Sequence, residues 1–189
     1  MTPRTDSDTL AVAPVSSTGR RVVAIGMGAL VVALAAQVRV PLPLTPVPVT
    51  LQDLAVLTVG GVLGPVAGAA ALVTYLALGI AGLPVFSGGA AGLVWLFGPT
   101  GGYLLAFPVA AYAMGAVAAR GGFVRALLGA ALGTVIIHLG GVAQLAVLSG
   151  SLDAAVRLGS LPFLTVSLVK TGLAAALVTG VSSTLARRH

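Results

Sequence analysis

Charged residues are scarce in this 189-residue chain, and cysteine, asparagine and glutamate are missing altogether. Only 7% of the residues are charged, whereas 58% are hydrophobic and the mean hydropathy is +1.10. A soluble domain carries about 25% charged residues, so a water-facing globular surface is excluded, as is intrinsic disorder. Cysteine is absent, which excludes disulfides, thiolate metal ligands and a cysteine nucleophile. Asparagine is absent too, so the chain has no N-glycosylation sequon.

The few charges stand at the ends of long apolar runs. No charged residue occurs from Leu54 to Ala119 or from Ala126 to Leu152. The ten basic residues outnumber the four acidic ones, but they do not cluster on a solvated domain as nucleic-acid binding requires. The chain is therefore expected to be an integral membrane protein with no nucleic-acid partner and with the lipid bilayer as its environment.

Apolar segments and their breaks predict an all-α integral membrane fold, a six-transmembrane-helix bundle whose outer loops form part of the ligand site. The second and third segments are short for a hydrocarbon core of about 30 Å at 1.5 Å per residue. The expected spans are residues 20–37, 51–63, 66–80, 103–119, 124–148 and 161–185.

The arginines predict the orientation. With six spans, both termini lie on one side, and Arg39 and Arg157 alone lie on the other. The terminal side holds Arg4, Arg20, Arg21, Arg120, Arg125, Arg187 and Arg188. The positive-inside rule then predicts a multi-pass cell-membrane protein with both termini cytoplasmic. Residues 1–19 are interpreted as a mobile cytoplasmic tail and residues 20–189 as a single membrane domain; a secretory signal beginning at Arg20 is the alternative.

Three connecting segments meet on the outer side in this topology. Residues 41–50 hold four prolines, which predict an extended loop without helix or sheet ladder. Thr50 and Asp53 then resemble a helix cap. Residues 82–102 are rich in glycine, which predicts either an outer loop or the wall of a binding cavity. Residues 149–159 are expected to form the third loop.

Lys170 is the most informative single residue, because it stands near the middle of the sixth span. A lysine there costs about 2.5–3.5 kcal/mol on insertion scales, and no acidic residue is expected inside a span to neutralise it. We therefore expect an anionic ligand to supply the missing charge; the alternative is a lysine that snorkels to the interface. Ser167 lies one helical turn earlier and faces the same way.

Other polar residues offer weaker signals. Gln52 follows the proline loop and can exchange hydrogen bonds with an amide-like ligand, although an interfacial glutamine is equally ordinary. Gln144 and His138 lie six residues apart on the fifth span and share no face. His138 is interpreted as a hydrogen-bonded core histidine. Two histidines without cysteine do not make a metal site.

Aromatic residues flank the glycine-rich segment. Phe86, Trp95, Phe97 and Tyr103 can provide flat apolar walls for a small solute, or an aromatic belt at the outer interface. Small residues also recur at a spacing of four, which favours close helix packing. Ala29 and Ala33 on the first helix are predicted to dock a second membrane subunit. The chain has no phosphate-binding loop and no acidic residue expected inside a span for a proton relay, so the energy for any uphill transport is expected to come from a partner.

Four segments carry a resemblance to a known family. They are VPVTLQDLAVL (47–57), YLALGIAGLPVFSGG (75–89), GPTGGYLLAF (98–107) and, more weakly, LPFLTVSLVK (161–170). In these segments the chain resembles the BioY family, the biotin-binding S components of energy-coupling factor transporters.

The resemblance implies biotin binding near the outer face, without a cofactor or an enzymatic activity. It also implies association with a transmembrane coupling subunit and a pair of ATPases. Of the site residues, the resemblance carries over Lys170. The residues that we expect to bind biotin are Lys170, Ser167, Gln52, Phe86, Gly88, Gly89, Tyr103 and Gln144. Ser167 departs from the family, which usually has an aspartate there, and Gln144 stands where an aromatic residue is common. The alternatives are an S component with altered specificity for another small anionic vitamin, a membrane enzyme and a structural subunit.

Overall fold

The computed structural model describes residues 17–43 and 45–186. Residues 1–16 of the expected tail lie outside this range, whereas residues 17–19 already belong to the first helix. The terminal arginines Arg4, Arg187 and Arg188 also lie outside it. The elements in chain order are α1 (Ser17–Gln37), β1 (Arg39–Val40), β2 (Val49–Thr50), α2 (Gln52–Leu63), α3 (Pro65–Ile80), η1 (Leu93–Phe97), α4 (Gly101–Ala118), α5 (Phe123–Ser149), α6 (Leu152–Gly159), η2 (Leu161–Phe163) and α7 (Leu164–Ala186).

The all-α membrane fold is confirmed, since α1 to α5 and α7 correspond to the six expected spans. Four helical segments in the described chain are long and apolar enough to cross a membrane, and α2 and α3 are shorter apolar helices. Gly64, with φ of +79°, ends α2, and Pro65 starts α3 at a position where a missing N–H costs nothing. Large apolar side chains such as Leu168 and Leu34 are 74% and 62% exposed, which suits contact with lipid.

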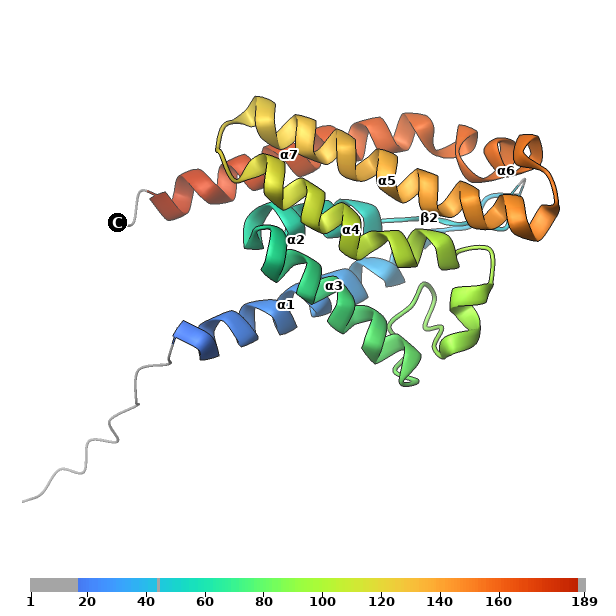
Figure 1. Cartoon of the computed structure of the whole chain (residues 1–189), viewed down its shortest axis with the longest axis horizontal. Coiled ribbons are helices and arrows are strands. Elements are labelled where there is room, and N and C mark those ends of the chain that lie inside the picture. Colours follow the sequence, from blue (N-terminus) through green and yellow to red (C-terminus); the bar gives the residue numbers. More distant parts are fainter. Residues whose placement is uncertain (1–16, 44, 187–189) are drawn as a thin grey trace, which may run out of the picture.

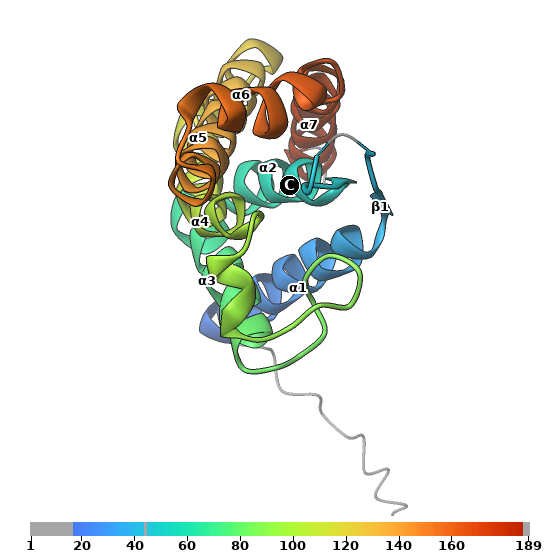
Figure 2. The ribbon, with the colours of Figure 1, turned by 90° about the vertical axis from the view of Figure 1, so that its right-hand side faces the viewer.

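The helices lie roughly along one axis, so the bundle has two ends (Figure 1). The start of α1, the α2–α3 and α4–α5 turns and the end of α7 lie at one end. The other end, here named the loop end, holds residues 38–51, 81–100 and 150–163 (Figure 1). Figure 2 looks onto the loop end: α5, α6 and α7 lie on one side, α1 and α3 on the other, and α2 and α4 between them. The three segments expected to lie together therefore do so.

Glycine allows the central helices to touch through their backbones. A Cβ on Gly60 would lie 2.5 Å from the Ala111 carbonyl oxygen, and one on Gly68 would lie 2.8 Å from the Gly60 Cα. Across α4 and α5, a Cβ on Gly102 would lie 2.1 Å from the Gly140 carbonyl oxygen. Such close approach is how helices gain packing contacts in lipid, where water drives no association.

The prediction that Ala29 and Ala33 form an exposed docking face is wrong. Both are buried, with 1% and 9% exposure, and pack into the hydrophobic core of the bundle. A spacing of four marks a small-residue face but does not say which neighbour covers it. In this chain α2 and α3 do so: a Cβ on the adjacent Gly28 would meet Val59 and Ala71.

All three expected loops contain regular structure, and in residues 82–102 this is the short helix η1. Residues 149–159 include α6, whose N-terminus is capped by the Ser151 hydroxyl, which accepts from the Ala154 N–H at 3.2 Å. The proline segment ends in a short antiparallel ladder that pairs Arg39 with Thr50 and Val40 with Val49. The prolines exclude a ladder only at their own positions, and β2 begins directly after the last of them.

Candidate functional site

A cavity of about 230 Å³ opens at the loop end and reaches between α2, α4, α5 and α7. This volume lies just below the range of about 300–1,000 Å³ that is typical of ligand pockets, so the cavity suits only a small ligand. All three loop-end segments contribute to its wall. The lining residues are Arg39, Pro46, Val47, Pro48, Val49, Thr50, Gln52, Asp53, Phe86, Ser87, Trp95, Thr100, Tyr103, Leu104, Phe107, Ile137, His138, Phe163, Val166, Ser167 and Lys170.

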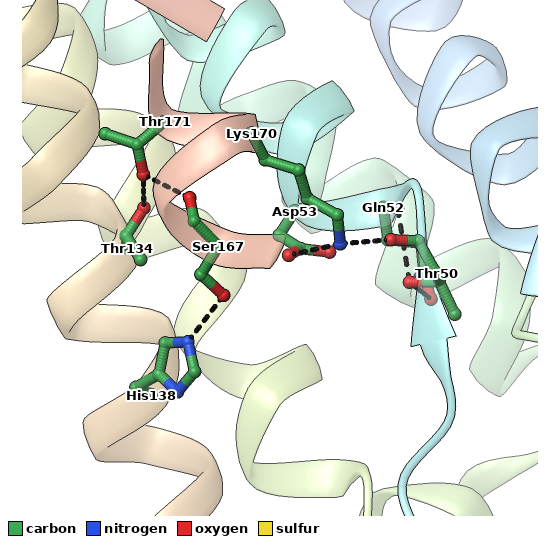
Figure 3. Close-up of polar contacts among 8 residues, drawn as sticks. All are labelled: Thr50, Gln52, Asp53, Thr134, His138, Ser167, Lys170 and Thr171. Atoms are coloured by element: carbon green, nitrogen blue, oxygen red, sulfur yellow. Dashed lines mark hydrogen bonds and ion pairs between the residues drawn. The ribbon is translucent and has the colours of Figure 1, made fainter. Parts of the chain in front are cut away.

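An ion pair forms the charged part of the cavity wall. Lys170 Nζ donates to Asp53 Oδ2 at 2.9 Å and to the Thr50 carbonyl (Figure 3). The lysine side chain is 9% exposed and the aspartate side chain 26% exposed. The expectation that no acidic residue neutralises Lys170 is therefore wrong. Asp53 does stand at a helix start, but α2 begins inside the bundle, because the loop before it folds inward between the helices.

Gln52 and Thr50 form a second group beside the ion pair. The Gln52 amide nitrogen donates to the Tyr75 hydroxyl at 2.7 Å, and that hydroxyl donates to the Val85 carbonyl at 3.2 Å. Thr50 Oγ1 accepts from the Gln52 N–H at 3.2 Å and donates to Gln52 Oε1 at 3.4 Å. The expected Thr50–Asp53 capping arrangement does not form, because Leu51 is the N-cap residue and the Asp53 carboxylate binds Lys170.

Ser167 and His138 line the opposite side of the cavity. His138 Nε2 lies 3.0 Å from Ser167 Oγ (Figure 3). The other ring nitrogen of His138, Nδ1, lies 3.3 Å from Ser160 Oγ. One turn further into the bundle, the hydroxyls of Thr134 and Thr171 lie 2.8 Å apart. As predicted, Ser167 faces the same cavity as Lys170. His138 is hydrogen-bonded, as expected, and it also lines the cavity.

Aromatic side chains enclose the rest of the cavity. Phe86 is 1% exposed and meets the Tyr75 ring edge-on, with the ring centroids 5.7 Å apart. Tyr103 donates its hydroxyl to the Gly159 carbonyl and so ties α4 to α6. Trp95 also lines the cavity, whereas Phe97 does not and is 70% exposed. The cavity-wall alternative thus holds for Phe86, Trp95 and Tyr103 and not for Phe97.

Three other predicted site residues do not line this cavity. Gly88 lies against the guanidinium group of Arg39. The Gly89 N–H donates to Gln37 Oε1 at 2.9 Å. The Gln144 amide nitrogen donates to the carbonyls of Leu96 and Gly98, at 2.9 and 2.6 Å. These residues hold the 85–101 segment in place.

The sequence-based analysis missed Asp53, Arg39, Ser87 and His138 as cavity residues. Asp53 and Arg39 were visible as charges in a chain with few of them, but both were assigned to helix or loop ends. Ser87 carried no signal beyond its place in the glycine-rich segment. Among the described residues, no cluster of three His, Asp or Glu side chains is placed to hold a metal ion.

A second cavity of about 440 Å³ lies between α5, α6 and α7. It shares His138 and Ser167 with the first, so the hydrogen bond between these residues lies at the boundary of the two. The remaining lining is mostly apolar and includes Leu139 and Leu168, which are 63% and 74% exposed.

The fold and the cavity define a membrane-embedded solute-binding protein, with a small polar site enclosed at one end of a helical bundle. The chain belongs to the BioY family, whose sequence profile matches residues 8–187. It is 36% identical over 151 residues to the "Probable biotin transporter BioY" of Pyrococcus horikoshii, covering 79% of this chain and 90% of that protein.

Further likenesses agree with this membership. The "Biotin transporter BioY" of Thermotoga maritima is 38% identical over 137 residues, covering 72% of this chain and 81% of that protein. The fold is similar to a crystal structure of the S-component for biotin from an ECF-type ABC transporter, with a TM-score of 0.80 and 23% identity. That match covers 87% of this chain and 91% of the other. The family is one of transporter components, not of enzymes.

Proposed function

We propose that this chain is the substrate-capture subunit of a biotin transporter. The observation that carries the proposal is the cavity at the loop end, which brings Lys170 and Ser167 together with the aromatic walls of Phe86 and Tyr103. Family membership narrows the ligand to the one that the relatives' names state. Biotin combines a polar ureido group, an apolar sulfur ring and a carboxylate, so it needs polar partners at two places and a flat apolar wall between them.

The residues predicted to bind biotin divide into two roles in this proposal. Lys170, Ser167, Gln52, Phe86 and Tyr103 line the cavity and contact the ligand. In contrast, Gly88, Gly89 and Gln144 shape or hold the segment that closes the cavity.

The subunit works with a transmembrane coupling subunit and a pair of ATPases in this proposal. The sequence has no phosphate-binding loop, so the energy for uphill transport comes from such a partner. Arg20, Arg21, Arg120 and Arg125 lie at the end of the bundle opposite the loop end, which supports cytoplasmic termini. The loop end, with its cavity, then faces the outside, where the solute is captured.

Binding of biotin to the detergent-solubilised protein, measured by calorimetry beside thiamin, riboflavin and the anionic vitamin pantothenate, tests the proposal. Biotin should bind most tightly, and Lys170→Met should weaken binding tenfold or more, since a hydrogen bond to a charged group contributes about 1.5–3 kcal/mol. The matched control is Arg157→Met, because Arg157 pairs with Asp153 on exposed α6 and lies outside the cavity. No binding of biotin, or unchanged affinity in Lys170→Met, would contradict the proposal.

Preference for another anionic vitamin would identify the second candidate, an S component with altered specificity. The observation behind this candidate is that Ser167 bonds to His138, whereas an aspartate at this position would add a second carboxylate beside Lys170.

Orientation has its own test, because the chain has no cysteine and a single introduced one is its only thiol. Ser151→Cys, at the loop end, should react with a membrane-impermeant maleimide in intact cells. Arg120→Cys, at the opposite end, should react only after the membrane is opened. The reverse pattern would show that the loop end faces the cytoplasm.

A further inference from the structure

Arg39 is a cation in the cavity wall that has no acidic partner among the described residues. It stands on β1 at the loop end, its residue is exposed, and it lines the same cavity as Lys170. Within residues 17–43 and 45–186, the ion pairs are Lys170 with Asp53 and Arg157 with Asp153, and neither involves Arg39. Its strand partner is Thr50, whose carbonyl accepts from Lys170. Arg39 and Lys170 therefore lie on two sides of one short strand.

Ser87 provides an unpartnered hydroxyl in the same wall. Its Oγ is buried and is the one buried side-chain polar atom of the described residues that has no hydrogen-bond partner. Buried hydroxyls are normally paired, so an orphan that lines a cavity points to a ligand.

Gly88 lies between the Arg39 guanidinium group and the Ser87 hydroxyl group, since it follows Ser87 in the chain and contacts Arg39. Its backbone lies so close to Arg39 that a Cβ there would stand 2.5 Å from the guanidinium carbon, and its φ is +71°. The positive φ favours glycine, and a side chain at this position would also displace the guanidinium group of Arg39. Gln37 on α1 holds this turn, since its amide donates to the Phe86 carbonyl at 3.3 Å and accepts from the Gly89 N–H at 2.9 Å. The guanidinium group of Arg39 therefore packs against the turn that carries Ser87, and Gln37 holds that turn in place.

The charges in the deeper part of the cavity cancel, because the ammonium group of Lys170 is paired with the carboxylate of Asp53. Lys170 Nζ has three donors and uses two of them, on Asp53 Oδ2 and the Thr50 carbonyl. In the described chain, the second carboxylate oxygen of Asp53 has no hydrogen bond. The pair therefore offers one free donor and one free acceptor. A ligand carboxylate placed here would set two carboxylates against one ammonium group, which raises the free energy of the ionised state.

We propose that Arg39 and Ser87 form an anion subsite at the cavity mouth, which binds the carboxylate of the ligand, while the Lys170–Asp53 pair binds its neutral ureido group. This inference rests on the proposed function. A guanidinium fork matches a carboxylate, and the Ser87 hydroxyl adds a donor. The ureido carbonyl accepts from Lys170, and a ureido N–H donates to Asp53. The carboxylate stays at the wetter mouth, where desolvation costs less. This arrangement replaces the expectation that Lys170 binds the carboxylate.

The test compares biotin with biotin methyl ester, which keeps the ureido ring and lacks the negative charge. Calorimetry on the purified full-length protein should show that the wild type binds biotin at least tenfold more tightly than the ester. Arg39→Gln should abolish that preference and bind both ligands about as tightly as the wild type binds the ester. Arg157→Gln, the matched control on α6, should retain the full preference.

Two further variants separate a subsite from a structural effect. Ser87→Ala should weaken biotin binding a few-fold and leave ester binding unchanged. Lys170→Met should weaken both ligands by similar factors, because it acts on the ureido end. Gly88→Ala should lose the preference as Arg39→Gln does, since the added Cβ displaces the guanidinium group.

Several results would overturn the inference. The wild type could bind biotin and its ester equally, Arg39→Gln could weaken both ligands equally, or Lys170→Met could be the variant that removes the preference. In each of these cases biotin binding itself persists, so the proposed function stands. If the wild type binds neither ligand, the proposed function fails instead, and the anion subsite fails with it.

Discussion

Asp53 and Lys170 stand 117 residues apart in the sequence, yet their side chains meet at 2.9 Å between α2 and α7. The pair joins the helix that follows the proline loop to the helix that ends the described chain. It lies in the wall of the candidate site, so we expect it to stabilise the bundle and propose that it also contacts the ligand.

Removing the aspartate should destabilise the protein, because it leaves the ammonium group of Lys170 buried without its counter-charge. We expect Asp53→Asn to lower the free energy of unfolding by about 3 kcal/mol, the lower end for a broken buried pair, since Asp53 is 26% exposed. The corresponding fall in Tm is about 6–12 °C by thermal unfolding in detergent. Asp153→Asn is the matched control, because the Asp153 side chain is 74% exposed and its ion pair with Arg157 contributes at most about 1 kcal/mol. Equal effects of the two substitutions would show that the Asp53 pair contributes no more than a surface one.

A carboxylate placed on α7 should replace the one on α2. Ser167 lies one turn before Lys170 and lines the same cavity. We expect the double variant Asp53→Asn/Ser167→Asp to recover most of the Tm lost in Asp53→Asn. If the double variant is no more stable than Asp53→Asn alone, the carboxylate must come from α2, where it also meets the end of β2.

The close contact of α2 and α4 should tolerate no added methyl group. Gly60→Ala should destabilise the bundle by about 1–3 kcal/mol, because its Cβ would lie 2.5 Å from a backbone oxygen of α4. The control is Gly172→Ala on α7, where no described heavy atom lies within 4 Å of the new Cβ. This control should be neutral or stabilising, since alanine favours helix. Denaturation of both variants by heat gives the comparison, and an equal response would argue against backbone contact.

Gln144 should affect the affinity for the ligand indirectly, through the segment around Leu96 and Gly98 that it holds in place. Gln144→Leu removes the bonds to the carbonyls of Leu96 and Gly98 and should speed amide hydrogen exchange in residues 92–101. Biotin affinity should fall only a few-fold, because Gln144 does not line the cavity. A loss of a hundredfold with unchanged exchange would instead restore the direct contact that the sequence suggested.

The six-helix plan could be read from local patterns. Hydropathy places the spans, Gly64 and Pro65 mark the α2–α3 turn, and the few charges mark the ends of the runs. These signals are local because the bilayer imposes the same apolar requirement on every spanning residue. The importance of Lys170 followed from the same reasoning, since a lysine in a span stands out against an apolar background.

The residues that contact Ala29 and Lys170 could not be predicted from local sequence patterns. Whether Ala29 faces a partner or its own bundle, and whether Lys170 is neutralised by a ligand or by Asp53, depends on how the helices pack against one another. That packing comes from backbone contacts such as Gly60 with Ala111, between residues far apart in the chain. Periodicity reports which side of a helix is small or polar, and it carries no information on which helix covers that side. The amino-acid pattern therefore settled the membrane class and the helices, whereas the assembled bundle settled the charge pairing and the shape of the site.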